Sequence, residues 1–293
     1  MQQNTILAML TPIKINLALH IIGQTDYNYL LLDSLVVFSL SGDEIIIKPS
    51  MQDNFTISGV YAFQLQEDSN NLVTQARDLL RSYASIIGRN CHFINIELRK
   101  NLPVASGLGG GSGDAASALI LLNKIWNLKL SQNTLLDLAK ELGADVPCCV
   151  YYILNKKSLY MGGIGEIIEP INNLQKLHIV IINSLEKTST KEVCKNVQNK
   201  YNLPINRCYD FNHLEHFITF LKQNRNDFLS SAINISPSIK LSLKQLETTA
   251  LFSTMSGSGA SCVGIFKNLL EAQESAKNIQ KQNPSWFVKV TSV

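Results

Sequence analysis

The sequence lacks any long uninterrupted run of apolar side chains. No stretch approaches the roughly 18 consecutive apolar residues that a membrane-spanning helix requires. The first residues also lack a cationic segment followed by an apolar core and a small-residue cleavage site, which is the pattern of a secretory signal. We therefore expect a cytoplasmic protein that does not enter a membrane.

An excess of charge of one sign is absent as well. The 26 lysines and arginines nearly balance the 23 aspartates and glutamates, which leaves a formal net charge of +3. The basic residues are scattered singly or in short pairs such as Lys156-Lys157, whereas a nucleic-acid-binding surface gathers them into a stripe. The composition thus excludes a broad nucleic-acid interface and favours a neutral or small anionic ligand.

Paired cysteine motifs are missing too. The six cysteines show no Cys-x-x-Cys spacing and no regular framework, so we expect reduced thiols with structural roles. Cys148 and Cys149 are adjacent in an apolar stretch, where packing in a core is favoured over metal binding. The five histidines show no metal-ligand spacing, and we assign no protein ligand to a metal.

What the sequence does contain is the composition of a globular enzyme. Its 293 residues, of which 45% are apolar and 17% charged, suffice for two modest domains. Apolar patterns predict strands over residues 15–22, 31–40, 43–48, 93–98 and 177–182, a hairpin over 161–167, and helices over 71–87, 114–126, 133–142, 212–222 and 237–246. This mixture indicates an α+β fold with an N-terminal domain over residues 1–155 and a C-terminal domain over residues 156–293. The last strand is a candidate for packing back on the N-terminal domain.

The strongest single feature is a glycine-rich loop with five glycines within residues 107–113. Glycine loses more backbone freedom on folding than any other residue, so such a cluster is unfavourable in an ordinary loop. It becomes useful where successive main-chain N–H groups must approach one anion, and a following helix adds the positive end of its dipole. The hydroxyls of Ser106 and Ser112 add two further donors. The loop is therefore predicted to bind phosphate.

Other glycine-rich loops are excluded by inspection. A Walker A loop ends in Gly-Lys-Ser/Thr, and no lysine is present here. The Gly-x-Gly-x-x-Gly patterns of dinucleotide-binding proteins and protein kinases fail because their sixth position, counted from Gly107, is Ser112. A flexible linker is the structural alternative, but a predicted strand and a predicted amphipathic helix flank the loop closely.

Read with its preceding proline, the loop resembles the nucleotide-binding motif of the superfamily of galactokinase, homoserine kinase, mevalonate kinase and phosphomevalonate kinase. Three other segments agree with that superfamily in the same order along most of the chain. They are Pro12-Ile-Lys14-Ile-Asn16-Leu, Leu142-Gly-Ala-Asp145-Val-Pro147 and Met255-Ser256-Gly257-Ser258-Gly259. The resemblance implies a two-domain α+β fold with an active site in the interdomain cleft.

The resemblance also implies which residues hold the nucleotide and the substrate. ATP would lie with its phosphates on the loop and Mg²⁺ would bridge phosphate oxygens. The nucleotide-binding residues would be Pro103, Ser106, Gly107, Leu108, Gly109, Gly110, Gly111, Ser112 and Gly113. The substrate-binding residues would be Asn16, Tyr29, Thr190, Ser256, Gly257, Ser258 and Gly259. A tight turn between two strands is the structural alternative for residues 256–259.

Lys14 and Asp145 are the catalytic residues that the resemblance implies. Asp145 would remove the proton of the attacking hydroxyl or only orient that hydroxyl, and the sequence leaves both roles open. Lys14 would pair with Asp145 and with the hydroxyl, which keeps the carboxylate charged. Position alone favours a solvated Asp145 in a loop and a Lys14 whose ammonium reaches solvent from a strand edge.

Two positions depart from the pattern of the subgroup that the chain resembles most, whose substrate carries a cytidine diphosphate. Leu30 stands where a histidine is usual after Tyr29, and Cys194 stands where an aromatic residue is expected four residues after Thr190. Both departures concern recognition of the pyrimidine base. Gly113 also replaces a serine that is common in the loop.

Three functions remain open from the sequence. The first is an ATP-dependent kinase of this cytidine-linked substrate, and the second is the same chemistry on another alcohol such as homoserine or a mevalonate-like acid. The third is a non-catalytic nucleotide-binding protein on the same scaffold. The partner is in each case a small molecule, and we expect a monomer or a weak homodimer.

Overall fold

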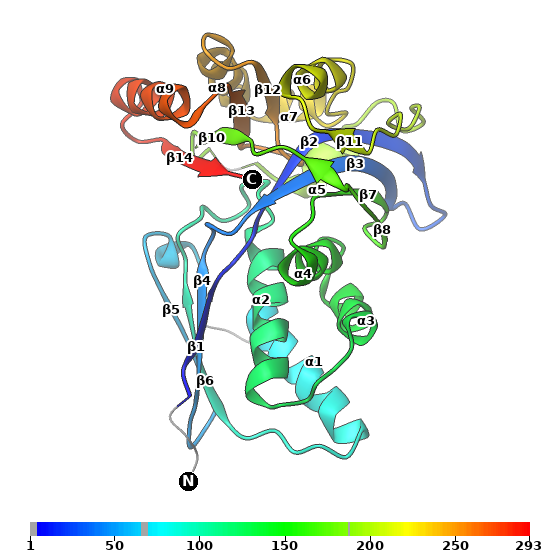
Figure 1. Cartoon of the computed structure of the whole chain (residues 1–293), viewed down its shortest axis with the longest axis vertical. Coiled ribbons are helices and arrows are strands. Elements are labelled where there is room, and N and C mark those ends of the chain that lie inside the picture. The colour runs from blue at the N-terminus through cyan, green and yellow to red at the C-terminus, as the bar shows by residue number, and fades with distance from the viewer. Residues whose placement is uncertain (1–4, 66–69, 187) are drawn as a thin grey trace. The chain divides into compact units, whose positions relative to one another are not determined.

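The computed structural model of the chain describes residues 5–65, 70–186 and 188–293 (Figure 1). The described residues form two compact units, each built from several stretches of the chain. Unit 1 contains residues 1–13, 40–104 and 109–156, and unit 2 contains residues 14–39, 105–108 and 157–293. One division between the units falls after Lys156, and residues 14–39 and 105–108, which lie within the predicted N-terminal domain of residues 1–155, belong to unit 2.

Unit 1 contains a four-stranded sheet with the order β1-β4-β6-β5. Its strands are β1 (Leu7–Leu10), β4 (Glu44–Pro49), β5 (Asn54–Ser58) and β6 (Ile94–Arg99). The β1–β4 and β4–β6 pairs are antiparallel, whereas β5 and β6 are parallel. Ile45 and Ile47 on β4, and Ile94, Ile96 and Leu98 on β6, are buried at alternate positions. This alternation gives the sheet one apolar face.

Four helices lie on one side of the sheet (Figure 1). They are α1 (Leu72–Ile86), α2 (Gly110–Ile125), α3 (Gln132–Leu142) and α4 (Val146–Asn155), and a 3₁₀ turn, η1 (Ala62–Gln64), precedes them. The helix α2 packs on β1 and β4 and is itself contacted by the other three helices. Its face of alanine and leucine side chains is buried, as the helical spacing predicted.

Two predicted helix starts are wrong, each for a local reason. The helix α2 begins at Gly110 and not at Asp114, because Gly109 adopts the left-handed conformation and the next glycines already form the first turn. The helix α3 begins at Gln132, because Ser131 and not Asn133 is the N-cap, with its side chain accepting a hydrogen bond from the Thr134 N–H.

Unit 2 contains two four-stranded sheets. The first has the order β2-β3-β7-β8, from β2 (Ile13–Gln24), β3 (Leu30–Ser39), β7 (Leu159–Gly163) and β8 (Ile167–Pro170). Because β3 pairs with β7, the early segment β2–β3 is bound to the later part of the chain. This pairing explains why residues 14–39 leave the predicted N-terminal domain.

The second sheet of unit 2 has the order β12-β13-β10-β14 and is antiparallel throughout. Its strands are β10 (His178–Asn183), β12 (Phe252–Met255), β13 (Cys262–Phe266) and β14 (Phe287–Ser292), and a small parallel pair joins β9 (Asn173–Leu174) to β11 (Asp210–Phe211). The last strand, β14, therefore lies beside β10 in unit 2.

The helices of unit 2 are α5 (Thr190–Lys195), α6 (Leu214–Lys222), α7 (Leu229–Ile235), α8 (Ser238–Glu247) and α9 (Leu269–Gln282). The helices α8 and α9 pack on strands of the second sheet. One apolar cluster, which we call the unit 2 core, joins these helices to β2, with Leu19, Ile21, Val180, Leu246 and Ile279 among its members.

No disulfide joins the six cysteines, all of which lie in the described part of the chain. Cys148 and Cys149 are buried on α4, which confirms the core-packing interpretation. Within residues 5–65, 70–186 and 188–293, none of the helices combines the length and apolarity that crossing a membrane requires.

Candidate active site

In unit 2, the segments at the beginning and the end of the chain meet the first part of the glycine-rich loop. The Asn16 N–H donates to Ser256 Oγ at 3.1 Å, and that hydroxyl donates to the Gly107 carbonyl at 2.9 Å. The Ser261 N–H binds the Ser106 carbonyl at 3.0 Å, and the Lys14 N–H binds the Leu108 carbonyl at 2.9 Å. Three motifs that are distant in sequence therefore form one constellation.

The amide of Asn16 is fixed on one side and unsatisfied on the other. Its Nδ2 donates to Ser34 Oγ at 2.7 Å, and Ser34 in turn donates to the Ala18 carbonyl. Its Oδ1 has no hydrogen-bond partner among the described residues, although only 1% of Asn16 is exposed. A Cβ atom on Gly257 would lie 3.6 Å from this oxygen. Asn16 thus presents a buried acceptor beside the third glycine motif, where a ligand hydroxyl can donate to it.

The glycine at position 107 is required by close backbone packing. Its φ angle is +76°, and a Cβ atom there would lie 2.4 Å from the Ser256 carbonyl oxygen and 2.7 Å from that of Gly259. Gly257 and Gly259 also have positive φ angles. Residues 256–259 do form the turn between β12 and β13, so the structural alternative is correct for the backbone and compatible with a binding role.

Thr190 and Ser258, two predicted substrate-binding residues, are also brought together. Their hydroxyls lie 2.9 Å apart, because Thr190 begins α5 and Ser258 stands in the β12–β13 turn. Asn226 holds this turn from the other side, donating through Nδ2 to the Met255 and Gly257 carbonyls, each at 2.8 Å. The role of Asn226 was not predicted, although a side-chain amide beside a turn of exposed carbonyls is a suitable donor pair.

Lys14 is buried, with 5% of its surface exposed. The structural alternative, a lysine whose ammonium reaches solvent from a strand edge, is therefore wrong. An ammonium group withdrawn from water needs compensating acceptors, which is the environment expected of a lysine that acts on an anionic group.

In unit 1, the second part of the glycine-rich loop forms the first turn of α2. Gly109 has a φ angle of +64° and is the N-cap, which turns the N–H groups of the following residues outward from the helix end. Gly111 is exposed, Ser112 is half-buried and Gly113 is buried. A Cβ atom on Gly113 would lie 2.5 Å from the Pro12 carbonyl oxygen, so a side chain is excluded there. The serine that is common at position 113 does not fit here. Pro103 precedes the loop and is buried in unit 1.

Asp145, also in unit 1, is the N-cap of α4. Its side chain makes no capping hydrogen bond, and the residue is partly exposed. The predicted position, just past one helix end and before Pro147, is confirmed.

Leu30 and Cys194, the two residues that depart from the expected base-binding pattern, contact the unit 2 core. Leu30 and Cys194 are both partly buried and pack against that cluster. Burial raises the pKa of the Cys194 thiol. Tyr29 remains 63% exposed and available to a ligand. At the positions predicted to bind a base, Leu30 and Cys194 thus serve in packing, and Tyr29 is the exposed aromatic residue.

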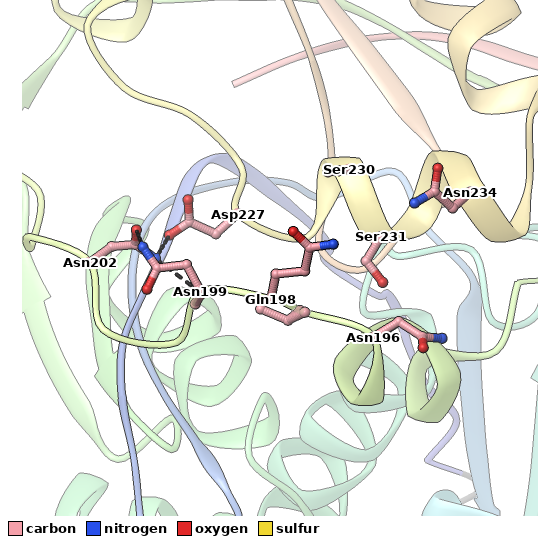
Figure 2. A pocket seen from close by; sticks show the side chains of 9 residues that line it. Asn196, Gln198, Asn199, Asn202, Asp227, Ser230, Ser231 and Asn234 are labelled. Carbon is pink, nitrogen blue, oxygen red and sulfur yellow. Dashed lines mark hydrogen bonds between the residues drawn. The ribbon is translucent and has the colours of Figure 1, made fainter.

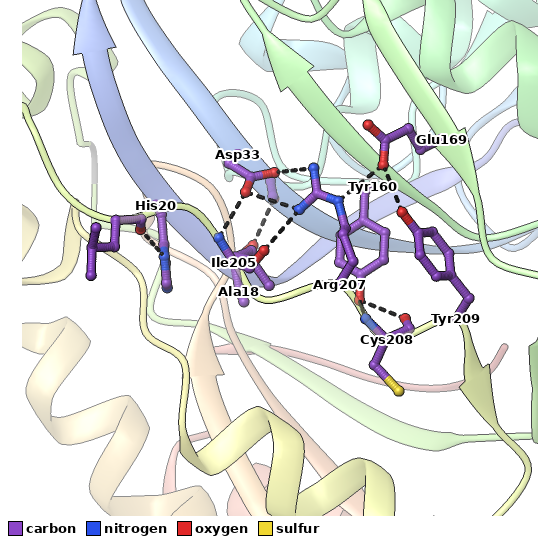
Figure 3. Close-up of polar contacts among 11 residues, drawn as sticks. Ala18, His20, Asp33, Tyr160, Glu169, Ile205, Arg207, Cys208 and Tyr209 are labelled. Carbon is purple, nitrogen blue, oxygen red and sulfur yellow. Dashed lines mark hydrogen bonds and ion pairs between the residues drawn. The ribbon is translucent and has the colours of Figure 1, made fainter.

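A buried ion pair that was not predicted fixes the segment after residue 204 to β3 (Figure 3). Arg207 binds Asp33 at 2.9 Å and Glu169 at 2.9 Å, and its guanidinium lies 4.4 Å from the centre of the Tyr160 ring. Burial raises the pKa of Tyr160 to about 12, so its hydroxyl stays protonated and donates to the Cys208 carbonyl at 2.8 Å. Asp33 is only 2% exposed. A carboxylate at that depth needs a charged or hydrogen-bonding partner, so the ion pair could have been predicted only if the burial of Asp33 had been known.

A polar hollow of about 200 Å³ lies in unit 2 next to α5 and α7 (Figure 2). Amide and hydroxyl side chains line it together with Asp227. Both Asp227 oxygens are already engaged, by Arg225 on one side and by the Ile21 N–H and Asn202 on the other. None of the predicted site residues lines this hollow.

Comparison with known proteins identifies the class to which this fold and these motifs belong. Residues 71–152 match the family described as GHMP kinases N terminal domain. A crystal structure of 4-(cytidine 5'-diphospho)-2C-methyl-D-erythritol kinase superposes with a TM-score of 0.77 at 23% identity, covering 98% of both chains. The mevalonate kinase of Methanococcus jannaschii superposes with a TM-score of 0.64 at 16% identity, covering 99% of this chain and 98% of the other. The fold is that of the GHMP kinases.

Relatives that match along almost the whole chain identify the family more narrowly. The 4-diphosphocytidyl-2-C-methyl-D-erythritol kinase of Bartonella bacilliformis is 39% identical over 96% of this chain and 92% of the relative. The enzyme of the same name from Rhizobium etli is 40% identical over 95% of this chain and 92% of the relative. The chain belongs to the 4-diphosphocytidyl-2-C-methyl-D-erythritol kinase family.

Proposed function

We propose that this protein transfers the γ-phosphoryl group of ATP to the 2-hydroxyl of 4-diphosphocytidyl-2-C-methyl-D-erythritol, a step of non-mevalonate isoprenoid precursor synthesis. The observation that carries the proposal is the similarity along almost the whole chain to relatives that bear this enzyme's name. The constellation of Asn16, Gly107 and Ser256 supports it, because this cluster joins the three motifs that such a kinase needs.

The ATP phosphates would be bound by main-chain N–H groups of the glycine-rich loop. Residues 109–113 offer them at the positive end of α2, and Ser106, Gly107 and Leu108 continue the loop in unit 2. Pro103 fixes the entry of the chain into the loop. Because Gly111 carries no side chain and is exposed, nothing on that residue blocks the approach of a phosphate.

Magnesium is the metal ion that such a reaction uses, and the residues of unit 1 fit it. Mg²⁺ prefers oxygen ligands and is usually held by one or two carboxylates together with the phosphates of the substrate. The half-buried Ser112 hydroxyl and the partly exposed Asp145 carboxylate are oxygen donors of this type. When bound, the ion would neutralise charge on the phosphate oxygens.

Asp145 and Lys14 are the proposed catalytic residues. A bond forms between the acceptor oxygen and the γ-phosphorus while the bond from that phosphorus to the β-phosphate oxygen breaks, and the hydroxyl proton must leave. Asp145 would accept this proton or hold the hydroxyl in line for the attack. The ammonium of Lys14 would stabilise negative charge that develops on the acceptor oxygen.

The substrate would be held by polar groups of unit 2. Asn16 Oδ1 would accept a hydrogen bond from a hydroxyl of the substrate, since this buried oxygen has no partner among the described residues. The hydroxyls of Thr190 and Ser258 and the turn formed by residues 256–259 would face the diphosphate or the sugar. Tyr29 would stack on the pyrimidine ring.

A kinase of an acidic alcohol is the second candidate, because homoserine kinase and mevalonate kinases share the fold. Recognition of a substrate carboxylate calls for an arginine with an available fork. Five of the six arginines are instead bound to acidic side chains of the same unit, namely Arg77, Arg81, Arg99, Arg207 and Arg225. The pairing of these arginines disfavours an acidic substrate.

The test is a coupled assay of ADP release with 4-diphosphocytidyl-2-C-methyl-D-erythritol, homoserine and mevalonate as alternative acceptors. We expect turnover with the cytidine-linked alcohol alone. Turnover with homoserine or mevalonate would refute the proposed substrate but would still support the proposed kinase activity. Tight binding of ATP without turnover of any acceptor would favour a non-catalytic nucleotide-binding protein. The presence of both Lys14 and Asp145 argues against that function.

A further inference from the structure

The segment that joins β10 to α5 in unit 2 carries Thr190, one of the residues proposed to bind the substrate. Asn183, at the end of β10, is 3% exposed. Its side chain donates through Nδ2 to Ser261 Oγ at 2.9 Å and accepts the Leu185 N–H at 2.7 Å. At the far end of the segment, the Thr190 hydroxyl lies 2.9 Å from that of Ser258. Both ends are therefore bound to the turn between β12 and β13.

Between these two ends, the segment is also bound to the start of α8. The Ser236 hydroxyl donates to Glu186 Oε2 at 2.7 Å. The hydroxyls of Ser184 and Ser238 lie 2.8 Å apart. Ser236 is fully buried, so its hydroxyl needs a partner within the fold. Hydrogen bonds from the Ser238 side chain, from Ser236 and from the Ser238 main chain lower the pKa of the Glu186 carboxyl, which is therefore charged at neutral pH.

Glu186 supplies what the start of α8 lacks. Among the described residues of this helix, the N-cap Pro237 makes no side-chain capping hydrogen bond, and the first turn holds no acidic residue. The N–H groups of a first helical turn have no partners within the helix, and the positive end of the helix dipole lies there. The Glu186 carboxylate offers an acceptor and a negative charge at this point. Glu186 therefore caps α8 from a different part of the chain.

The helix α8 is also in contact with the β12–β13 turn. Ile239 and Leu246 are fully buried, and α8 packs on β12 and β13. A Cβ atom on Gly259 would lie 3.2 Å from Ile239 Cδ1, so the first turn of α8 lies against the turn that contains Ser258. The contacts of Glu186 and Thr190 therefore hold the segment against one packed group of elements.

We infer that Glu186 is a positioning residue of the proposed substrate site, which it serves by holding the segment that carries Thr190 against α8. The inference rests on the proposed function. Without the carboxylate, Thr190 is held less firmly, and the substrate must order it on binding. That ordering reduces the free energy of substrate binding and leaves the chemical step unchanged. Loss of the Glu186 carboxylate should thus raise KM for the alcohol without lowering kcat.

The experiment is steady-state kinetics of the whole chain with 4-diphosphocytidyl-2-C-methyl-D-erythritol and ATP, each varied in turn. For Glu186→Ala we expect KM for the alcohol to rise by about 3- to 10-fold, with kcat and KM for ATP within about twofold of wild type. Glu186→Gln keeps an oxygen that can accept from Ser236, so its KM for the alcohol should stay within about twofold of wild type. Because Glu186 is exposed, both variants should fold.

Glu271→Ala is the matched control, because it removes a carboxylate from the start of another helix of unit 2. Glu271 lies in the first turn of α9, and its hydrogen bonds within the described residues are with Asn268, at 2.8 and 2.9 Å. Its loss weakens a helix cap, as the loss of Glu186 does, but at a distance in sequence from every residue proposed to bind substrate. We expect Glu271→Ala to leave kcat and both KM values unchanged.

A second variant tests the route through α8. Ser236→Ala removes the hydroxyl that donates to Glu186, so it should raise KM for the alcohol to a similar extent. The double variant should be no worse than Glu186→Ala alone, because both changes break the same contact. Additive effects would show that the two residues act separately, which would overturn the inference.

An unchanged KM for the alcohol in Glu186→Ala, with a wild type that turns over this alcohol, would overturn the inference and leave the proposed function intact. Equal rises in KM for Glu186→Ala and Glu271→Ala would also overturn it, since weaker helix capping would then explain both. Absence of turnover by the wild type would remove the proposed function and the inference with it.

Discussion

Asn16 occupies the most closely defined position among the residues proposed to bind substrate. Its main-chain N–H is bound to Ser256, its amide nitrogen is bound to Ser34, and only Oδ1 is left without a partner among the described residues. An orphaned buried acceptor costs about 1–3 kcal/mol. A substrate hydroxyl that reaches this oxygen would recover that free energy, which makes the residue a source of binding energy as well as of orientation.

Replacement of Asn16 by alanine should therefore weaken substrate binding more than it weakens the fold. We expect kcat/KM for the cytidine-linked alcohol to fall by about 10- to 100-fold, which corresponds to about 1.4–2.8 kcal/mol. Steady-state kinetics at fixed ATP measure the effect. Asn202→Ala removes an amide of the same unit that binds Ile21 and Asp227, and it should leave kcat/KM unchanged. Equal losses in both variants would contradict the role of Asn16.

Asp145→Asn should remove most of the catalytic activity and leave ATP binding nearly unchanged. The amide keeps the size of the side chain but cannot take up a proton, so we expect kcat to fall by about 10²- to 10⁴-fold. The dissociation constant for ATP, measured by calorimetry, should stay within about twofold of the wild-type value, because main-chain N–H groups of the loop are proposed to bind the phosphates. An unchanged kcat would remove Asp145 from the mechanism.

Tyr29→Ala should separate base recognition from phosphoryl transfer. Tyr29 is 63% exposed, whereas Leu30 and Cys194 pack against the unit 2 core. Tyr29 is therefore the aromatic side chain that is proposed to contact the base. Loss of one stacking face costs about 1–3 kcal/mol, which predicts a KM for the cytidine-linked alcohol that rises by about 5- to 100-fold with kcat nearly unchanged. Tyr201→Ala, at a tyrosine that is 74% exposed and belongs to no motif, is the matched control. A lower kcat at unchanged KM would refute the stacking role.

At the scale of the elements, the glycine segments differ in what holds each glycine in place. Gly107→Ala should lower the free energy of unfolding by about 2–4 kcal/mol, because its φ angle of +76° and the Ser256 carbonyl at 2.4 Å from a Cβ atom both exclude a side chain. Gly111→Ala should not destabilise the fold, since a Cβ atom there meets only Leu72 at 3.7 Å and alanine favours a helix. Denaturant unfolding followed by circular dichroism measures both, and equal effects would show that the positive φ angle does not matter.

Replacement of Gly110 by a bulky residue tests a different property of the same segment. A Cβ atom on Gly110 would press on Lys100 and Asp43, and the rest of the side chain would disturb the first turn of α2. Gly110→Val should therefore raise the dissociation constant for ATP by at least tenfold, or about 1.4 kcal/mol, in a calorimetric titration. An unaltered dissociation constant would contradict phosphate binding by this turn.

The elements with a clear apolar period were predictable, and those shaped by tertiary contacts were not. The helix α1 agrees within about one residue with the prediction, because its N-cap Asn71 and its apolar face are both local signals. The helix α4 was missed because it is apolar on nearly every side and therefore has no period. The early start of α2 was missed because glycine has low helix propensity, and only packing against Pro12 and Lys100 makes a helical turn of glycines favourable.

The candidate site was predictable where motifs carried it. The sequence indicated Asn16, Gly107, Ser256, Thr190 and Ser258. In unit 2, Ser256 is hydrogen-bonded to Asn16 and Gly107, and the hydroxyls of Thr190 and Ser258 lie side by side. The sequence assigned no role to the supporting residues Asn226 and Ser34, because the role of a single amide or hydroxyl depends on which carbonyl it reaches in the fold. The sequence therefore indicated the groups that are proposed to face a ligand, and the tertiary structure identified the residues that orient them.

At the scale of the whole molecule, the buried cluster of Lys100, Asp43 and Asp114 makes stability depend on pH. The pKa of Asp114 is raised from 3.8 to about 7 in the folded protein. The folded state then binds more protons than the unfolded state, so this contribution to stability is complete below about pH 4 and is lost as the pH rises towards 7. Asp114→Asn should remove that loss, and its free energy of unfolding relative to wild type should rise between about pH 5 and about pH 8 by about 1–3 kcal/mol. Urea unfolding at several pH values measures this, and a difference independent of pH would contradict the raised pKa.

Each unit is built from stretches that are distant in sequence, which limits where the polypeptide can be divided into parts that fold separately. Residues 14–39 supply β2 and β3 to unit 2, and β3 pairs with β7, which lies more than 100 residues later in the sequence. A polypeptide that begins at Lys157 would lack both strands and would leave an unpaired edge along β7. We therefore expect two co-expressed halves, cut at the apparent boundary after Lys156, to become soluble only by reassociating, so that neither half serves as a stand-alone module for transfer into a chimeric enzyme.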